Sequence, residues 1–306
     1  MEKQSELILV TGFLGAGKTT LIKRLLHMYR GEKIHLIVNE FGRAAVDGAL
    51  LDGLGATMDE IVNGSIFCAC RLDEFEAALD RAQADGPDKI IVEASGLSDP
   101  TAIRSLLEAG GRYPQIHYKG CIALADAGRL HKVIDTARAC AKQLAAADLI
   151  VLGKTDAAPP ETTAAARALL AERYPFTPVI EAVMGDVPRA AIDALRAGHP
   201  AEEADDRRDL TLQKALVEVS PEMTAAQLRA FIGLFVEETC RVKGLVRVKD
   251  GVFQVDCVGA YVQLAPYDGP GVDNRVAALA VAGMALRKSL KNAISWYEGY
   301  VTAAAP

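Results

Sequence analysis

The residues with the clearest chemical meaning lie at 11–20, where the chain reads TGFLGAGKTT. Gly12, Gly17, Lys18 and Thr19 fit the spacing G-x-x-x-x-G-K-[ST], which is typical of a loop that cradles phosphates. Glycines let backbone N–H groups turn inward around phosphate oxygens, and the start of a following helix adds partial positive charge. Lys18 would reach the β- and γ-phosphates and stabilise the transferring group, and the Thr19 hydroxyl would bind Mg²⁺. The pattern predicts a nucleoside triphosphate site.

The segments on both sides of this loop have the types that phosphate binding requires. Residues 7–10 form a short apolar run of the strand type, and residues 20–30 place leucines at roughly helical spacing. A strand, a glycine loop and a helix therefore follow one another in the expected order. Gly15, Ala16 and Thr20 complete the set expected to contact the phosphates.

A second segment, IIVEASGLSDP at 90–100, carries an acidic residue at the end of an apolar strand. P-loop proteins hold Mg²⁺ with a carboxylate at that place, so we expect Glu93 to bind the metal ion. Gly96 could donate its backbone N–H to the γ-phosphate and act as the hinge of a switch. The alternative is that Glu93 caps a helix that begins near residue 100.

A third segment, LIVLGKTD at 149–156, predicts the base. The Asp156 carboxylate can accept two N–H bonds from the guanine edge, a pair that adenine cannot supply, and Lys154 would lie along the base. A polar group left unpaired in a buried site costs roughly 1–3 kcal/mol, more when it is charged, which rejects adenine. The alternative is that Asp156 is the N-cap of the next helix.

The segment VNEFGRAAVDGALL at 38–51 is a candidate switch loop. It carries Glu40 and Asp47 between glycines, and we expect it to order around Mg²⁺ and the γ-phosphate. Glu40 or Asp47 would position the attacking water, although acidic loop residues are often simply solvated. Hydrolysis without a partner is expected to be slow.

The elements that must position these residues alternate along the first part of the chain. Apolar runs expected to form buried strands and the helical patterns between them are as follows: strands at 34–39, 89–93, 121–126, 149–153 and 178–182, and helices at 73–84, 100–109, 130–147 and 161–173. Near-continuous apolar strands alternating with helices indicate a mostly parallel sheet covered on both faces, with phosphate sites at the carboxyl ends of its strands. We therefore expect an α/β P-loop NTPase domain over 1–185.

The pattern changes after residue 185. The polar and charged stretch within 186–210 predicts a linker. Residues 211–306 combine short alternating strands with helical patterns, and Lys249-Asp250-Gly251 between two apolar alternations predicts a hairpin. A small α+β domain is expected there.

Composition narrows the classes of function. The chain of 306 residues has a formal net charge of −6 and a pI near 5.5, which argues against broad attraction to nucleic acid or anionic membranes. No apolar stretch is long enough to span a bilayer, and the start MEKQSELILV lacks the apolar core of a signal peptide. We expect a cytoplasmic protein whose six cysteines are free, buried or metal-binding rather than disulfide-bonded.

The ordered set GFLGAGKTTL, VNEFG with DGALL, NGSIFCAC, EASGLSDP, QLAAADLIVLGKTD and RVKGLVRV resembles the CobW-like family of P-loop GTPases. These are relatives of the urease and hydrogenase nickel-insertion GTPases. The resemblance implies a GTPase domain followed by a small CobW-type C-terminal domain. It also implies a weak GTPase that uses GTP, GDP and Mg²⁺ and acts as a metallochaperone or metal-insertion factor, for zinc or cobalt among others.

The chain departs from the family pattern at three places. The cysteine segment reads GSIFCAC at 64–70, so that Cys68 keeps the place of a family cysteine and Cys70 is a new thiol. Arg43 replaces the last glutamate of NEFGE, which would repel a nearby cation. Gly153 replaces the asparagine of N-K-x-D that orders the base loop, so we expect a weaker guanine preference.

Cys68 and Cys70 leave two interpretations open. Two thiolates at C-x-C spacing can bind one ion such as Zn²⁺ or Co²⁺, although zinc sites normally use three or four protein ligands. The pair precedes the helix expected at 73–84, whose start would lower the thiol pKa. The alternative is a switch or partner contact. Four more residues could complete a metal site: His117, Cys121, His131 and Cys140. For the two cysteines, the commoner case is a buried side chain that acts as a small apolar residue.

The leading prediction is a GTP-dependent metallochaperone or metal-cofactor insertion factor whose partner is a client metalloprotein. The alternative is a GTP-dependent assembly or activation factor for a metallo- or corrinoid enzyme that carries no metal itself. Neither a nucleic acid nor a membrane is expected as a partner, and homodimer formation is left open.

Overall fold

The computed structural model describes residues 4–39, 56–61, 72–96, 100–108, 111–198, 212–258, 261–269, 271–281 and 284–304. The chain divides into two compact units, one of residues 1–134 and 138–208 and the other of residues 135–137 and 209–306. Among the described helices, none combines the length and the apolar character needed to cross a bilayer.

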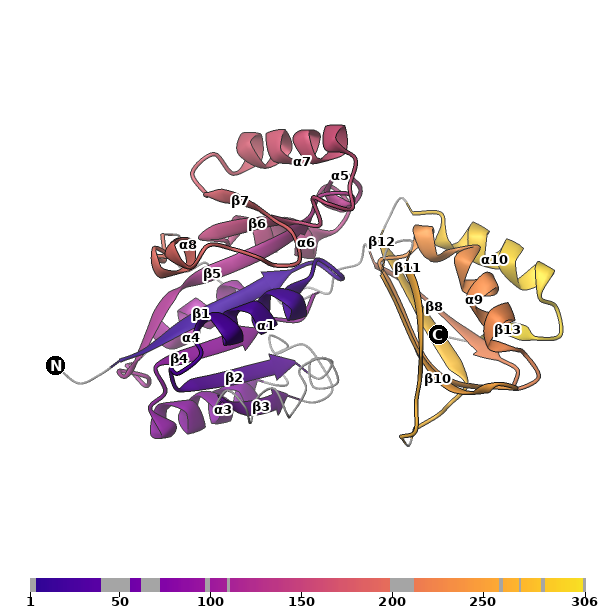
Figure 1. Ribbon diagram of the computed structural model, residues 1–306, viewed down its shortest axis with the longest axis horizontal. Helices are drawn as coiled ribbons and strands as arrows, with labels where there is room; N and C mark the ends of the chain where they lie inside the picture. Colours follow the sequence, from indigo (N-terminus) through magenta and orange to yellow (C-terminus); the bar gives the residue numbers. More distant parts are fainter. Residues whose placement is uncertain are drawn as a thin grey trace. The chain divides into compact units, whose positions relative to one another are not determined.

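The first unit is built on a seven-stranded sheet in the order β3-β2-β4-β1-β5-β6-β7, with every neighbouring pair parallel (Figure 1). Its strands are β1 (Ser5–Gly12), β2 (Ile34–Asn39), β3 (Ala56–Ile61), β4 (Lys89–Glu93), β5 (Ile116–Asp126), β6 (Leu149–Gly153) and β7 (Val179–Ala182). Its helices are α1 (Lys18–Met28), α3 (Leu72–Asp85), α4 (Thr101–Glu108), α5 (Leu130–Val133), α6 (Arg138–Ala145), α7 (Pro160–Arg173) and α8 (Arg189–Asp193).

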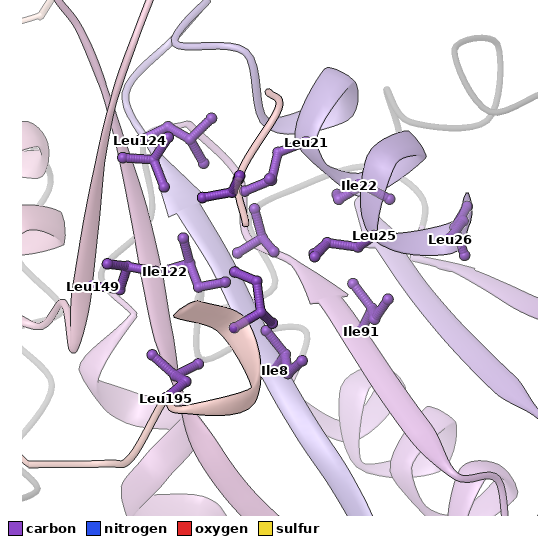
Figure 2. Packing of buried hydrophobic residues seen from close by; sticks show 14 of the residues in the cluster. Ile8, Leu21, Ile22, Leu25, Leu26, Ile91, Ile122, Leu124, Leu149 and Leu195 are labelled. Carbon is purple, nitrogen blue, oxygen red and sulfur yellow. The ribbon is translucent and has the colours of Figure 1, made fainter. Parts of the chain in front are cut away.

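Alternate residues of β1 point to opposite faces of the sheet, and both faces are covered. Ile8 and Val10 lie in a core with the apolar side of α1, where Leu21, Leu25 and their neighbours are fully buried (Figure 2). Leu7 and Leu9 belong to a second core with α3 and α4. Each fully buried aliphatic side chain contributes roughly 1.5–3 kcal/mol, so the two cores fix β1 and the loop that follows it. The predicted parallel α/β fold is confirmed.

Several elements differ from the predictions for local reasons. The helix expected over 130–147 is two helices, α5 and α6, because Asp135 and Thr136 lie between them and such short polar side chains compete with helical backbone bonds. Strand β3 was not predicted, since it carries Asp59 and Glu60 at the sheet edge instead of an apolar run. Strand β5 begins at Ile116, five residues earlier than expected.

Part of the segment predicted as a linker over 186–210 belongs to the first unit. Val187, Ile192 and Leu195 are buried in the same core as α1. The Arg189 guanidinium lies 4.9 Å from the centre of the Tyr29 ring and bonds Glu32. The linker therefore starts later than residue 186, and the other predicted boundaries stay predictions.

The second unit is an antiparallel sheet with helices, as predicted. Its six strands have the order β11-β10-β9-β12-β8-β13. They are β8 (Leu212–Val219), β9 (Arg241–Val248), β10 (Gly251–Val258), β11 (Tyr261–Pro266), β12 (Arg275–Val281) and β13 (Val301–Ala304), with α9 (Ala225–Gly233), a 3₁₀ turn (Val236–Glu238) and α10 (Leu286–Trp296). The predicted hairpin is present, since Val248 pairs with Gly251 across a two-residue turn. Thr224 and Gln227 form a capping box at the start of α9.

Candidate nucleotide-binding site

The glycine loop connects the end of β1 to the start of α1. Gly12, Gly15 and Gly17 have φ angles of 142°, 77° and 105°, a region in which residues with a Cβ are strained. A Cβ on Gly12 would also lie 2.7 Å from the carbonyl oxygen of Leu124 in β5. The path of the loop therefore requires glycine at Gly12 both for its backbone angle and for its close approach to β5.

Lys18 and Thr19 begin α1 and face two different neighbours. Lys18 Nζ donates to the carbonyl oxygen of Gly12 at 2.7 Å. Thr19 Oγ1 donates to Glu93 Oε1 at 3.5 Å, which joins α1 to the end of β4. Glu93 lies opposite Val10 in the parallel pairing of β1 and β4 and is only 8% exposed. A hydroxyl and a sheltered carboxylate are oxygen ligands of the kind that Mg²⁺ prefers, so the donor set fits the predicted ion.

The turn after β4 lies against the glycine loop. The N–H of Ala94 donates to the carbonyl oxygen of Val10 at 2.9 Å, which continues the β1–β4 pairing beyond Glu93. Gly96 is buried, and a Cβ there would lie 2.7 Å from Leu14 Cδ2 and 3.0 Å from the Leu14 backbone nitrogen. The structure therefore brings Gly96 to the loop. Its contact with a γ-phosphate stays a prediction.

The loop after β6 carries the predicted base-reading residues. Lys154 has a left-handed backbone with φ 59°, and its carbonyl oxygen accepts the N–H groups of Ala157 and Ala158. Lys154 Nζ donates to Asp126 Oδ2 at 2.7 Å. Asp156 is exposed, and within the described residues its carboxylate has neither a hydrogen bond nor an ion pair. The N-cap of α7 is Pro159, so the alternative that Asp156 caps this helix is wrong.

Gly153 stands where the guanine motif has asparagine. A Cβ at this position would meet the carbonyl oxygens of Ala16 at 3.7 Å and Ala125 at 3.8 Å, which are ordinary contacts. The absence of a side chain at Gly153 is therefore not imposed by crowding. A larger residue there would face a carbonyl of the glycine loop.

These segments lie at the carboxyl ends of four consecutive strands, β4, β1, β5 and β6 (Figure 1). The parallel registers place Glu93 beside Val10, Leu124 beside Gly12, and Gly153 beside Asp126. Ligands of open α/β sheets bind at this edge. The arrangement can accept phosphates at the glycine loop, a divalent cation at Thr19 and Glu93, and a base near Asp156.

Asp126 is a residue of this edge that the sequence analysis did not assign. It ends β5, and its side chain is 15% exposed. The available signal was an acidic residue at the end of an apolar strand, the same signal that pointed to Glu93. It was missed because the sequence does not show that β5 and β6 are neighbours.

Several predicted residues lie outside the described part of the chain: Glu40, Asp47, Cys68 and Cys70. The switch loop and the cysteine pair therefore stay predictions. Among the described residues no three His, Cys, Asp or Glu side chains are grouped to hold a metal ion, so His117, Cys121, His131 and Cys140 do not form such a group. Four described cysteines are buried and form no disulfide within the described residues, as expected for apolar cysteines: Cys121, Cys140, Cys240 and Cys257.

Two sequence relatives each match part of this chain. The chain is 35% identical over 227 residues to the zinc chaperone CobW of a Sinorhizobium species, covering 64% of each protein. It is 39% identical over 160 residues to the zinc chaperone YeiR of Escherichia coli strain K12, covering 50% of this chain and 48% of the relative. The chain thus spans about half to two thirds of the length of these relatives.

A solved structure and a family profile complete the comparison. The crystal structure of the Zn(II)-bound YjiA GTPase from E. coli covers 96% of this chain and 99% of its own, with a TM-score of 0.50 and 21% identity. That likeness concerns the fold alone. The profile of the CobW/HypB/UreG nucleotide-binding domain matches residues 6–180, more than half of the sequence. The chain therefore belongs to the CobW/HypB/UreG family.

Proposed function

We propose that this protein binds GTP with Mg²⁺, hydrolyses it slowly, and uses the GTP-bound state to deliver a transition metal to a client protein. The observation that carries the proposal is that the glycine loop, Glu93 and Asp156 lie at the same edge of the sheet, at the ends of strands within the run β4-β1-β5-β6. The zinc chaperone relatives favour Zn²⁺ as the cargo. A cytoplasmic location and a client metalloprotein as partner belong to the same proposal.

Lys18 would bind the phosphates through its ammonium, which has three N–H donors. In the structure Lys18 Nζ donates to the neutral carbonyl oxygen of Gly12 at 2.7 Å. A bond to a phosphate oxygen has two charged partners and adds direct charge attraction. Such a bond is therefore favourable, and it would place a positive charge at the transferring group. The glycine loop supplies backbone N–H donors around the same phosphates.

Mg²⁺ would supply charge neutralisation at the β- and γ-phosphate oxygens. Thr19 and Glu93 would hold it, because their oxygens already face each other at 3.5 Å. Glu40 or Asp47 in the 38–51 loop would position the attacking water, and hydrolysis would release that loop.

Guanine selection would rest on Asp156. Its exposed carboxylate has no partner among the described residues, so no existing bond has to break before it accepts two N–H groups of a base. Rejection of adenine would follow because the carboxylate would then lose water without gaining those bonds. The Lys154 stem would lie along the base.

The proposal is tested by nucleotide binding and phosphate release on the full chain. Competition against a fluorescent GTP analogue should give a lower Kd for GTP than for ATP, and hydrolysis should require Mg²⁺. Glu93→Gln should slow hydrolysis about a hundredfold, whereas the matched control Glu181→Gln on β7 should not. Equal affinity for ATP would refute the role of Asp156, and an absence of nucleotide binding would refute the whole proposal.

The altered cysteine segment favours a second candidate, an assembly or activation factor that carries no metal. Only Cys68 retains a family cysteine position in GSIFCAC, and Cys70 is additional. Co²⁺ titration of the Mg-GTP form distinguishes the two. Thiolate absorption that is lost in Cys68→Ser supports the metal carrier. No absorption in either protein supports the factor without cargo.

A further inference from the structure

The Asp126 carboxylate connects two loops at the nucleotide edge of the sheet. Oδ1 accepts the backbone N–H of Gly128 at 3.0 Å, within the turn between β5 and α5. Oδ2 accepts Lys154 Nζ at 2.7 Å, from the loop after β6. The Asp126 side chain is 15% exposed and that of Lys154 is 38% exposed, so the carboxylate end of the pair is sheltered from water.

A backbone bond reinforces the same connection. The N–H of Ala127 donates to the carbonyl oxygen of Gly153 at 3.0 Å, directly beyond the β5–β6 pairing. The residue that follows, Lys154, adopts the left-handed region, which is uncommon for a residue with a Cβ. Such a conformation persists only where the surroundings impose it. The ion pair with Asp126 holds the Lys154 side chain, and the N–H groups of Ala157 and Ala158 hold its carbonyl oxygen.

Asp156 depends on this support. It lies two residues after Lys154, in a turn whose N–H groups return to the Lys154 carbonyl. In N-K-x-D motifs the asparagine orders this loop, and here Gly153 has no side chain with which to do so. Another contact must therefore hold the loop after β6 in one conformation if the Asp156 carboxylate is to accept two N–H groups of guanine at the same time.

We propose that Asp126 is a positioning residue for guanine recognition, which holds Lys154 and thereby fixes Asp156 in place of the missing asparagine. Asp126 acts through Lys154 and does not touch the nucleotide. The proposal rests on the proposed function, since it presumes that Asp156 reads guanine. A purely structural ion pair between β5 and β6 would instead affect GTP and ATP alike.

The test measures the ratio of the ATP and GTP dissociation constants on the full chain. Asp126→Asn keeps the shape and the acceptor for Gly128 but removes the charge that holds Lys154. We expect the Kd for GTP to rise about tenfold and the Kd for ATP to change little. The tenfold figure corresponds to the loss of one charge-assisted hydrogen bond, made smaller because the Lys154 end of the pair is partly exposed to solvent. Asp85→Asn is the matched control, because it removes a lysine–carboxylate pair of the same length, 2.7 Å, with Lys33.

A rescue variant separates positioning from folding. Gly153→Asn introduces the missing amide, and the Cβ of the new side chain would lie at ordinary van der Waals distance from the nearest carbonyl oxygens. In the Asp126→Asn background it should restore most of the GTP preference. If Asp126→Asn fails to fold, the same ratio is measured on Lys154→Met, which keeps the stem and removes the ammonium. Loss of the GTP preference there supports the proposal, and an unchanged ratio overturns it.

The outcomes also separate this inference from the proposed function. A wild-type protein that does not prefer GTP refutes the role of Asp156 itself. A wild-type protein that prefers GTP, with Asp126→Asn either unchanged or weakened equally for GTP and ATP, overturns only the role of Asp126.

Discussion

Gly96→Ala tests whether the turn after β4 and the glycine loop act as one unit. The added Cβ would lie 2.7 Å from Leu14 Cδ2, 3.0 Å from the Leu14 nitrogen and 3.1 Å from its Cα. Non-bonded carbon atoms prefer about 3.5–4.0 Å. The flexible end of the leucine can move away, but the backbone atoms belong to the loop that cradles phosphate. The substitution must therefore displace the glycine loop, displace the turn, or leave both under strain.

The expected size follows from this geometry. Overpacking of a close contact costs about 1–3 kcal/mol. If the nucleotide-free loop stays in place, the free energy of unfolding falls by that amount. If the loop relaxes, GTP must push it back, and binding weakens by the same amount, roughly five- to hundredfold in Kd. The two losses should therefore sum to about 1–3 kcal/mol, however they are divided.

Urea unfolding of the nucleotide-free protein and titration with a fluorescent GTP analogue measure the two parts. Gly233→Ala is the control, because a Cβ there has no atom within 4 Å. If Gly96→Ala matched the wild type in both measurements within about 0.5 kcal/mol, the range of ordinary surface substitutions, the close packing of Gly96 on Leu14 would be refuted.

Two further predictions concern a half-buried carboxylate and the buried thiols. Hydrogen bonds and charge from Lys89 and Lys119 lower the pKa of Glu6 against the opposing effect of burial, so this carboxylate stabilises the fold above about pH 4.5, its ordinary pKa, and less as the pH falls. Glu6→Gln should cost about 1.5–3 kcal/mol at pH 7, the range for hydrogen bonds to charged groups, and flatten this acid dependence in urea unfolding; an unchanged dependence would contradict it. Four cysteines are buried, Cys121, Cys140, Cys240 and Cys257, and burial also raises the pKa of the Cys121 thiol. Ellman's reagent should therefore leave these four thiols unlabelled until denaturant is added, and their rapid labelling would contradict their burial.

The parts of the fold that follow local patterns could be predicted from the sequence. Apolar runs predicted β2, β4 and β6 with the bounds that the structure has. The parts of the fold that depend on tertiary contacts could not be predicted in this way. Strand β3 gains its backbone bonds from β2 at the sheet edge, with Asp59 held by His35 and Arg81 rather than by apolar burial. The burial of Ile192 of α8 in the core of the first unit also depends on tertiary packing, and the charged residues beside it gave no sign of that burial.

The candidate site shows the same division. A motif fixes the loop around Lys18 because spacing within one segment determines its geometry. Glu93 could be predicted because it ends a recognisable strand, although it lies 74 residues from Thr19. The contact of Asp126 with Lys154 could not, since it depends on which strands are neighbours and on their register. Strand order is set by packing of the whole sheet, and the local sequence around Asp126 or Lys154 does not indicate it.

The sheet order also explains how the chain can lose one part of the family pattern and keep another. In the proposed site, the segments at β4 and β1 would hold phosphate and Mg²⁺, and those at β5 and β6 would hold the base. Neighbouring strands are about 4.8 Å apart, so the separation of β4 from β6, with β1 and β5 between them, is fixed at about 14 Å by the sheet rather than by any loop. A change at Gly153 therefore alters base recognition without moving Thr19 or Glu93. Compensation must come from a neighbouring strand end, and Asp126 is the carboxylate that β5 places beside it.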